Sequence, residues 1–404
     1  WEPHVPCLLH EAVSSMLDIR SRCQDGTFDG LYVDCTFGRG GHSRHILRHL
    51  SERGRLVAFD VDPEAVAVAR RLEREDSRFK IIHRPFADID KVLRPNTVDG
   101  VLIDLGVSSP QLDDRHRGFT ERGDEIADMR MNQSQGVSVA EWLRDSQVTA
   151  EELAWIIHKW GEDSDALLSE RIAALLVEEQ RRNPSMLWTT RRLAAAIQRV
   201  KKTDPNNMPV AKLAMQALRI WINQEMDQMD MALHGACHVL KEKGRCCVIT
   251  FKRKEQELLT RFTREHEDPD DFMKDLLSPS RLCELYPLVA TNKTFCLRQI
   301  DVVKPTLEEV QSNNRSRSSV VHVIRKDARA VMFNLSNLPS RSVEQRLRKP
   351  DVCLVVPFKG TDVPDQEVVD YDWVNGLPLQ QPQLEARAAA AHGAAPLPER
   401  PPAA

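Results

Sequence analysis

The sequence predicts an α/β protein built on a doubly wound parallel sheet, with an all-helical domain inserted into the sheet. Three observations support this prediction. Short apolar runs alternate with helical segments over the first hundred residues. A glycine-rich turn follows the first apolar run, where a strand would pass into a helix. The alternation stops at about residue 135 and returns only near residue 245.

The first four strands are predicted from short runs rich in valine, isoleucine and leucine, a composition typical of parallel strands buried on both faces. The runs cover residues 31–35, 55–60, 79–83 and 98–104. Helical segments lie between them, and Pro63 fits the first turn of the second helix, where no backbone N–H is needed. This order of strands and helices implies parallel pairing.

The second half of the chain is expected to begin with helices and to end with strands. Residues 135–205 show no convincing strand. Apolar side chains then recur every three or four positions over 213–240, which predicts one long amphipathic helix, and Gly244 is expected to end it. Further strands are predicted at 245–251, 294–303 and 319–326.

These patterns divide the chain into five segments. The first part of the sheet domain covers 1–134, the inserted helical domain 135–205 and the second part of the sheet domain 206–326. A C-terminal extension follows over 327–378, with one possible strand at 352–358. Residues 379–404 are rich in alanine and proline, and we expect them to form a disordered tail.

Composition excludes several classes of protein. Hydrophobic residues make up 41% of the 404 residues, enough for a large core, and the net charge of −4 argues against a chain that binds nucleic acid over its whole surface. No apolar run approaches the roughly 20 residues that span a bilayer. The nine cysteines include no C-x-x-C pair, so the sequence predicts reduced thiols and no metal site.

The glycine-rich turn is the first candidate binding site. Gly38, Gly40 and Gly41 follow the first strand, and Asp60 ends the second, a spacing that suits a carboxylate bound to ribose hydroxyls. No Walker lysine follows the glycines, and their spacing is not G-x-G-x-x-G. The pattern therefore favours an adenosine cofactor without a phosphate, which points to S-adenosylmethionine. A tight turn with close packing is the alternative.

Longer motifs carry a specific resemblance. The segments HVPCLLHEAV, DCTFGRGGHSRHIL, AFDVDPEAVAVA, IIHRPF, DGVLIDLGVSSPQLDDRHRGF and DMRMN follow one another in order. VAEWL, WGED, TTRRLA, QALRIWINQE and NNRSRSSVVHV continue the series, which spans about residues 4–326. This series resembles the RsmH/MraW family, whose members methylate N4 of a cytidine in small-subunit ribosomal RNA. The resemblance implies a Rossmann-like methyltransferase sheet with an inserted helical domain.

The resemblance also implies roles for particular residues. Gly38, Gly40, Gly41 and His42 would contact S-adenosylmethionine, and Asp60 would hold its ribose. Phe86 would pack against the adenine, with plain core packing as the alternative. Asp104 and Gln111 would complete the pocket. His42 could instead cap the following helix.

The segment DLGVSSPQ (104–111) follows the fourth strand, at the edge where open α/β sheets bind ligands. The amine of cytosine is a poor nucleophile, so its N–H groups need acceptors as the nitrogen attacks the methyl group. Asp104 is the candidate acceptor, and Ser108 and Ser109 are candidate contacts to the base. Asp104 could alternatively cap the turn. The base must leave any stack to react.

The most basic stretch, 180–202, contains seven arginines and lysines, no acidic residue and Trp188. It suits contact with RNA phosphates plus one stacking platform, with a solvated helix face as the alternative. The predicted RNA-binding residues are Arg191, Arg192, Lys201 and Lys202.

Three segments depart from the family pattern. Residues 250–258 read TFKRKEQEL where the family has a stretch close to SFHSLEDR, and 208–217 and 120–127 also differ. Lys252, Arg253 and Lys254 would therefore bring cations near the sulfonium and slow methyl transfer. A second hypothesis follows, namely an assembly factor of the small subunit with weak or no activity. A DNA amine methyltransferase is less favoured, because DLGVSS replaces the Asp-Pro-Pro-Tyr-like turn of that class.

The partners expected from these features are small-subunit ribosomal RNA and the pre-ribosomal particle, with no membrane. The first residue is Trp1 and the tail is rich in alanine and proline, which favours the mitochondrion as the site of action. The bacterial cytoplasm is the alternative.

Overall fold

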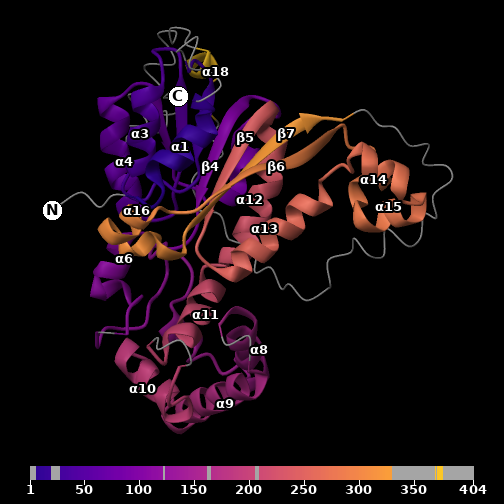
Figure 1. Cartoon of the computed structure of the whole chain (residues 1–404). Coiled ribbons are helices and arrows are strands. Elements are labelled where there is room, and N and C mark those ends of the chain that lie inside the picture. The colour runs from indigo at the N-terminus through magenta and orange to yellow at the C-terminus, as the bar shows by residue number, and fades with distance from the viewer. Residues whose placement is uncertain are drawn as a thin grey trace, which may run out of the picture.

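The computed structural model describes residues 6–19, 28–121, 123–161, 165–204, 209–329, 369 and 371–375. Its centre is a seven-stranded sheet in the order β3-β2-β1-β4-β5-β7-β6 (Figure 1). β1 to β5 are parallel, and β7 runs antiparallel to both of its neighbours. The strands are β1 Leu31–Asp34, β2 Arg55–Phe59, β3 Phe79–Ile82, β4 Val98–Asp104, β5 Leu240–Thr250, β6 Phe295–Val303 and β7 Val320–Ala328. The predicted doubly wound α/β sheet is confirmed.

Helices cover both faces of the sheet. The helices α1 (Leu9–Leu17), α3 (Gly41–His49) and α4 (Pro63–Glu75) share one hydrophobic cluster with β1, β2 and β3. On the other face, α5 (Ile89–Val92), α12 (Glu225–Val239) and α13 (Arg253–Glu265) contribute to a second cluster. Each strand of the central region is therefore buried from both sides, as its apolar composition predicts.

A third hydrophobic cluster belongs to a separate helical module. It runs from Ala127 to Leu218 and is built by the helices α7 Val139–Trp142, α8 Ala150–Trp160, α9 Ala166–Arg182, α10 Thr190–Val200 and α11 Lys212–Ile222. Figure 1 shows α8 to α11 together below the sheet, beyond the end of α12. Helices occupy the region where the sequence predicts them, and the exact boundaries of the inserted domain stay a prediction.

The single long helix predicted over 213–240 is wrong. The chain forms α11 and α12 instead, and they are separated at Asn223 and Gln224, the latter with a left-handed φ of 50°. The two helices bury different faces, because α11 packs in the helical module and α12 packs on the sheet. Gly244 does not end a helix either. It lies inside β5, which starts at Leu240 directly after α12.

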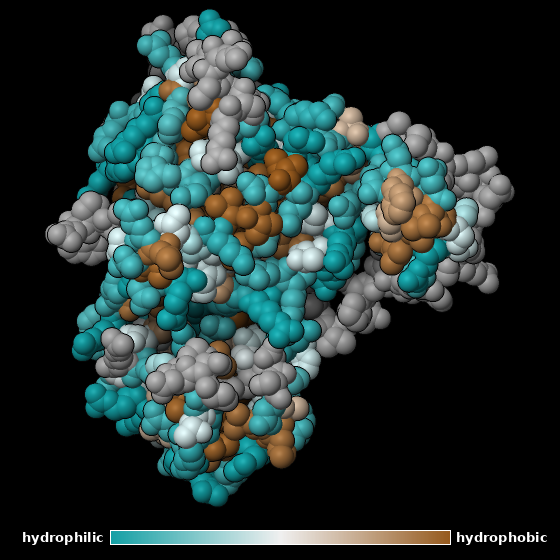
Figure 2. All heavy atoms as spheres, in the orientation of Figure 1, coloured by the Kyte–Doolittle hydropathy of each residue, from teal (hydrophilic) through white to brown (hydrophobic). Residues whose placement is uncertain are grey.

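The remaining elements are short. They are η1 Phe86–Asp88, α6 Ser109–Asp113, η2 Arg115–Arg117, α14 Asp271–Leu276, α15 Pro279–Leu285, η3 Pro287–Ala290, α16 Leu307–Ser312, η4 Asn314–Ser318 and α18 Tyr371–Val374. α14 and α15 form a small lobe beside the sheet, and Figure 2 shows an apolar patch on it. Phe272 and Leu276, both in α14, are 71% and 63% exposed. No helix in the described part of the chain is long and apolar enough to cross a membrane.

The C-terminal extension meets the sheet domain again at α18. The indole N–H of Trp373 donates to the carbonyl of Ser77, and the Arg55 side chain donates to the carbonyl of Trp373. Val369 joins the cluster beneath α12. The strand predicted at 352–358 and the tail predicted at 379–404 lie outside the described residues.

Candidate cofactor and substrate site

Three carboxylates lie along one edge of the sheet, where adjacent parallel strands end. Asp34 ends β1, Asp104 ends β4 and Asp60 directly follows β2. Because β2, β1 and β4 are neighbours, the three acids lie in a row at the carboxyl edge, the usual ligand edge of such sheets. Sequence reasoning identified Asp60 and Asp104 but missed Asp34, which shows the same signal of an acid at the end of an apolar run.

The structure explains why glycine occupies positions 38, 40 and 41 of the turn. Gly38 and Gly40 have φ values of 56° and 82°, which side chains disfavour. A Cβ on Gly41 would lie 2.2 Å from Cγ of Pro6, so this glycine permits close packing of the N-terminal segment. Gly40 also precedes α3 without a side-chain cap, and its N–H donates to the carbonyl of Phe37 at 2.8 Å.

Asp60 holds the two loops that flank it. Its carboxylate accepts from the N–H of Gly38 at 2.8 Å and from the N–H of Asp62 at 2.9 Å. Burial, with a smaller contribution from the charges of Asp62 and Asp34, outweighs the two N–H donors and raises the pKa of Asp60 to about 7. Each oxygen keeps a lone pair that a ligand hydroxyl could use.

Asp104 presents an acceptor that nothing in the described part of the chain uses. Its Oδ1 is buried without a hydrogen-bond partner there, and its Oδ2 lies 3.8 Å from Nδ1 of His42. Burial, together with the charges of Asp34 and Glu255, raises the pKa of Asp104 to about 8. The N–H of Leu105 donates to the carbonyl of Ile249. Among the described residues no backbone N–H of the turn donates to the carboxylate of Asp104, so the alternative of Asp104 as the cap is not supported.

His42 lies buried in the first turn of α3. Burial lowers the pKa of its imidazole to about 4, so the ring is neutral at physiological pH. Its Nε2 is buried with no partner among the described residues. The residue that caps α3 is Gly40, so the alternative of His42 as the capping side chain is not what the structure shows.

Ser108, Ser109 and Gln111 lie at the start of α6. Ser108 is the residue before the helix, Ser109 is its first residue, and both are partly exposed. Gln111 is buried, and both ends of its amide are engaged: Oε1 accepts from the N–H of Ser108, and Nε2 donates to Asp62, each at 2.9 Å. The structure thus gives Gln111 a role in shaping the site, and a direct cofactor contact stays a prediction.

Phe86 begins η1 and packs, partly buried, against the cluster that α12 forms with the sheet. Its ring can therefore pack against the core on one side and against a ligand on the other. The described residues include no group of three or more His, Cys, Asp or Glu side chains that could hold a metal ion.

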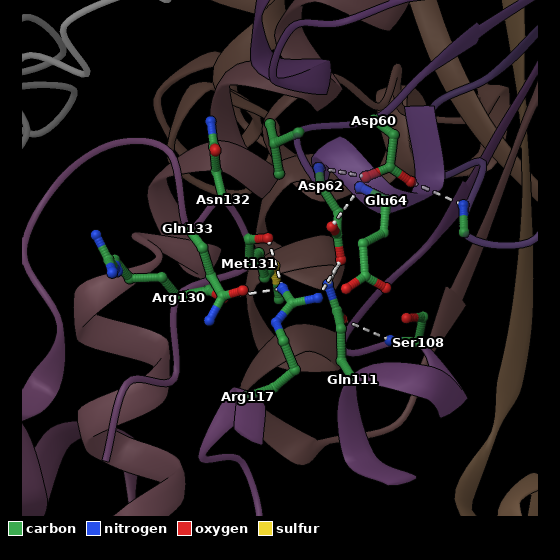
Figure 3. Close-up of polar contacts among 12 residues, drawn as sticks. Asp60, Asp62, Glu64, Ser108, Gln111, Arg117, Arg130, Met131, Asn132 and Gln133 are labelled. Atoms are coloured by element: carbon green, nitrogen blue, oxygen red, sulfur yellow. Dashed lines mark hydrogen bonds and ion pairs between the residues drawn. The ribbon is translucent and has the colours of Figure 1, made fainter. Parts of the chain in front are cut away.

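Sequence reasoning missed a buried ion pair beside this edge (Figure 3). Nη1 of Arg117 lies 2.9 Å from Oδ2 of Asp62, and the two side chains are 4% and 6% exposed. The same Asp62 oxygen accepts from Gln111, and the other oxygen accepts from the N–H of Glu64 at the start of α4. Asp62 and Arg117 are 55 residues apart, and no sequence pattern connects them.

Comparison with known proteins places the chain. The model of the MraW methylase family matches residues 2–327. The chain belongs to the MraW methylase family. It is similar to the ribosomal RNA small subunit methyltransferase H of Shewanella woodyi and to that of Shewanella sediminis, each 39% identical over 328 residues. Each alignment covers 80% of this chain and 97% of the relative.

Solved structures add little to this assignment. An rRNA methylase from Streptococcus thermophilus aligns with a TM-score of 0.29 and 12% identity, over 79% of this chain and 93% of that one. A score this low carries no argument about function, so the fold assignment depends on the strand order described above.

The departures from the MraW pattern after β5 do not create a free positive charge. Nζ of Lys252 lies 3.2 Å from Glu225 and 3.0 Å from Glu255. Arg219 also binds Glu225 through two hydrogen bonds, so two cations face two carboxylates. Burial opposes ionisation of Glu225, but the two cations outweigh it and lower its pKa to about 2.

The neighbouring cations are paired with a carboxylate as well. The side chain of Arg253 is 83% exposed and pairs with Glu257, and Lys254 lies 3.6 Å from the same glutamate. Arg253 and Lys254 share Glu257, and Lys252 pairs with two glutamates, so the repulsion of a sulfonium expected from these cations is reduced. Its effect on turnover stays a prediction. The hypothesis of an inactive assembly factor is not favoured, because the similar relatives are named as methyltransferases.

The predicted RNA-binding face also needs correction. Arg191, Arg192 and Lys202 are exposed, as a phosphate contact requires. Lys201 is only 6% exposed, and its Nζ lies 2.8 Å from Asp204, so it is part of the interior. Trp188 is 1% exposed in the core of the helical module and cannot serve as a stacking platform.

Exposed aromatic surface occurs elsewhere in the module. Trp155 is 40% exposed and meets Trp160 and Trp221 edge to face, at centroid distances of 6.3 Å and 6.4 Å. Trp142 lies 6.2 Å from Trp221. This aromatic group spans α7, α8 and α11, and its helical positions alone would not distinguish it from core.

Proposed function

We propose that this MraW-family protein transfers a methyl group from S-adenosylmethionine to N4 of a cytidine in small-subunit ribosomal RNA. Family membership supports the reaction class, and the relatives of similar length are named for small-subunit ribosomal RNA. The observation that carries the proposal is the row of acids at the sheet edge, with the unpartnered Oδ1 of Asp104 at its end.

The residues present fit S-adenosylmethionine. Asp60 accepts from the ribose hydroxyls with the lone pairs that Gly38 and Asp62 leave free. The uncapped first turn of α3, at Gly41 and His42, receives the aminocarboxylate through backbone N–H groups and the helix dipole. Phe86 packs against the adenine. The cofactor supplies an electrophilic methyl group on a sulfonium.

Asp104 prepares the cytidine amine. The N4 lone pair is delocalised into the ring, and accepting an N–H hydrogen bond at Oδ1 lets the nitrogen pyramidalise toward the methyl carbon. The N4–C bond forms as the C–S bond breaks, with its electron pair passing to sulfur, and the surplus N4 proton goes to an acceptor. An ionised Asp104 can take that proton, while Ser108 and Ser109 contact the base edge.

The helical module contributes the RNA surface. Arg191, Arg192 and Lys202 contact phosphates from α10 and its C-terminal end, and Trp155 offers an exposed ring for stacking. The target base leaves its stack to reach Asp104. The pre-ribosomal particle is the partner that presents such RNA.

The test is methyl transfer by wild type and by Asp104→Asn, which keeps the shape of the side chain but loses its charge. With labelled S-adenosylmethionine and immature small subunits, we expect label at cytidine N4 and a loss of about 10²–10³-fold in the variant. Equal binding of S-adenosylhomocysteine by both proteins is the control for folding. Normal subunit assembly in cells with no methylation by wild type would favour the assembly-factor hypothesis.

The pKa of Asp104 also predicts how the rate of the reaction depends on pH. Its pKa of about 8 means that the acceptor is protonated at lower pH. The value of kcat/KM should therefore rise through about pH 8, since this ratio reports the free enzyme. A profile that stays flat from pH 6.5 to 9 would contradict the role given to Asp104.

The compartment is a separate proposal. The relatives named above are bacterial, which agrees with the bacterial cytoplasm, whereas the mitochondrion was expected from the sequence ends. Imaging of the tagged full chain, together with fractionation of ribosomal particles, decides between the two compartments.

A further inference from the structure

A buried network of hydrogen bonds connects the cofactor edge with the entrance to the helical module. Asp62 lies at its centre. Its backbone N–H donates to Asp60, and its carboxylate accepts from Arg117. Asp62 thus links Asp60, the proposed ribose ligand, to Arg117, as Figure 3 shows.

Arg117 reaches in a second direction. Its Nη2 donates to the carbonyl of Met131 at 2.8 Å and to that of Arg130 at 3.2 Å. A guanidinium suits this position, because its planar fork presents Nη1 to the carboxylate and Nη2 to the backbone carbonyls in fixed directions, whereas the donors of an ammonium all leave from one atom. The backbone carbonyl of Arg117 also accepts from the N–H of Met129 at 3.0 Å.

Residues 129–131, which Arg117 contacts, are strained. They are also hydrogen-bonded to a second side chain. Met129 is buried with a φ of 60°, a conformation that costs free energy for a bulky residue and persists only where its surroundings enforce it. Asn223, at the break between α11 and α12, donates to the carbonyl of Met129 and accepts from the N–H of Met131, each at 2.7 Å.

Residues 129–131 are therefore fixed at two points. Arg117 ties them to the cofactor edge, and Asn223 ties them to the helix pair where the chain returns from the module to the sheet. The chain enters the module through this segment and leaves it at Asn223. A displacement of the module changes the position of both clasps.

We propose that Arg117 is a positioning residue that transmits the position of the helical module through Asp62 to Asp60, so that cofactor affinity depends on the docked module. The inference rests on the proposed use of Asp60 as the ribose ligand. Arg117 itself touches neither cofactor nor RNA in this assignment.

The experiment is a double-mutant cycle on cofactor affinity, with S-adenosylhomocysteine as the calorimetric probe. Arg117→Lys keeps a positive charge beside Asp62 but loses the fork, and Asn223→Ala removes the second clasp. Each single change should weaken binding about fivefold to tenfold. Because both act through residues 129–131, the double variant should bind no more than about twofold worse than Arg117→Lys alone.

Controls separate this role from simple destabilisation. Arg182→Gln breaks an exposed ion pair with Glu178 on α9 and should leave affinity unchanged. Thermal unfolding shows which variants are folded, and Asp62→Asn, which keeps the shape of the acid, replaces Arg117→Lys if that variant fails to fold.

The outcomes are distinct. Losses that multiply in the double variant would overturn the coupling, because they would show two independent effects. Single variants with wild-type affinity would overturn it as well. A folded wild type that does not bind S-adenosylhomocysteine would instead refute the proposed cofactor site.

Discussion

The cofactor edge and the outer face of the helical module hold their polar side chains in different ways. At the cofactor edge, Asp62 and Arg117 are almost fully buried and bind partners far away in the sequence. On the module, Arg182 and Arg191 are 72% and 69% exposed, with Glu178 and Asp124 as their carboxylate partners. Buried ion pairs fix one geometry, whereas exposed pairs contribute little and leave the side chain available to a ligand. The same residue types therefore build the site in one region and can bind RNA in the other.

The largest expected effect that tests this comparison concerns Trp188. This residue belongs to the basic stretch of the sequence but lies in the core of the helical module. Trp188→Ala should lower the free energy of unfolding by about 3–5 kcal/mol, because it empties a large buried site. Trp155→Ala, on an exposed ring, should cost about 1 kcal/mol or less. Chemical unfolding of both variants checks this, and equal losses would mean that Trp188 is not in the core.

The next effect tests the exposed face itself. Arg191→Ala, Arg192→Ala and Lys202→Ala together should lower the log–log salt slope of single-stranded RNA binding by about 2, and affinity roughly fiftyfold at 0.15 M salt, if all three contact phosphates. Lys201→Ala is the matched control: its salt slope should stay at the wild-type value, since Lys201 is buried with Asp204. A triple variant with an unchanged slope would show that this face is only solvated.

A smaller effect is expected at the cofactor edge. Asp60→Ala should weaken S-adenosylhomocysteine at least tenfold, because a charge-assisted hydrogen bond contributes about 1.5–3 kcal/mol. Calorimetry measures this, with Arg182→Gln on the exposed face of α9 as the control. If Asp60→Ala binds as tightly as wild type, the ribose lies elsewhere.

The smallest effect follows from the pKa of Asp60, which is about 7 in the folded protein. Ribose hydroxyls donate to the ionised carboxylate, so ligand affinity is complete above pH 7 and falls by up to about tenfold per unit as the pH drops below 7. Methylthioadenosine, which lacks the amino-acid group, is the suitable probe. Asp60→Asn should bind weakly and without this dependence, and a pH-independent wild type would contradict the assignment.

The stability of the free protein should also depend on the protonation of Asp60, but it should fall with rising pH where ligand affinity rises. The folded pKa of Asp60 lies above its ordinary value of 3.8, so the folded state holds the proton more tightly than the unfolded chain. The contribution of Asp60 to stability is therefore complete below about pH 4 and is lost as pH rises toward 7. Cofactor binding and stability of the free protein thus favour different pH ranges.

The sheet could be predicted from sequence because its strands are buried on both faces and read as continuous apolar runs. β4 was predicted at its exact bounds, and β1 and β2 to within one residue. The break at Gln224 could not be predicted, since the apolar spacing continues across it. That spacing serves two different surfaces, one on the module and one on the sheet.

The site was predictable where backbone geometry dictates the residue. The left-handed φ of Gly38 and Gly40 favours glycine, and acids at strand ends are readable from the sequence. Burial of Lys201 and Trp188, and the pairing of Arg117 with Asp62, depend on tertiary contacts that no local pattern encodes. The balance of charge around Lys252 likewise requires Glu225, which is 27 residues away.

The insertion between β4 and β5 has a consequence for how the chain is made. β4 ends at Asp104, and its partner β5 begins only at Leu240. At a synthesis rate of roughly 5–20 residues per second, the ribosome needs on the order of ten seconds to deliver that partner. During this interval one side of an apolar strand is an open edge that another chain could pair with. The buried residues of the module's hydrophobic cluster lie within residues 127–218, so the module can fold while the half-finished sheet waits. Slow translation of this insertion should therefore promote aggregation of the nascent protein more than slow translation after β5.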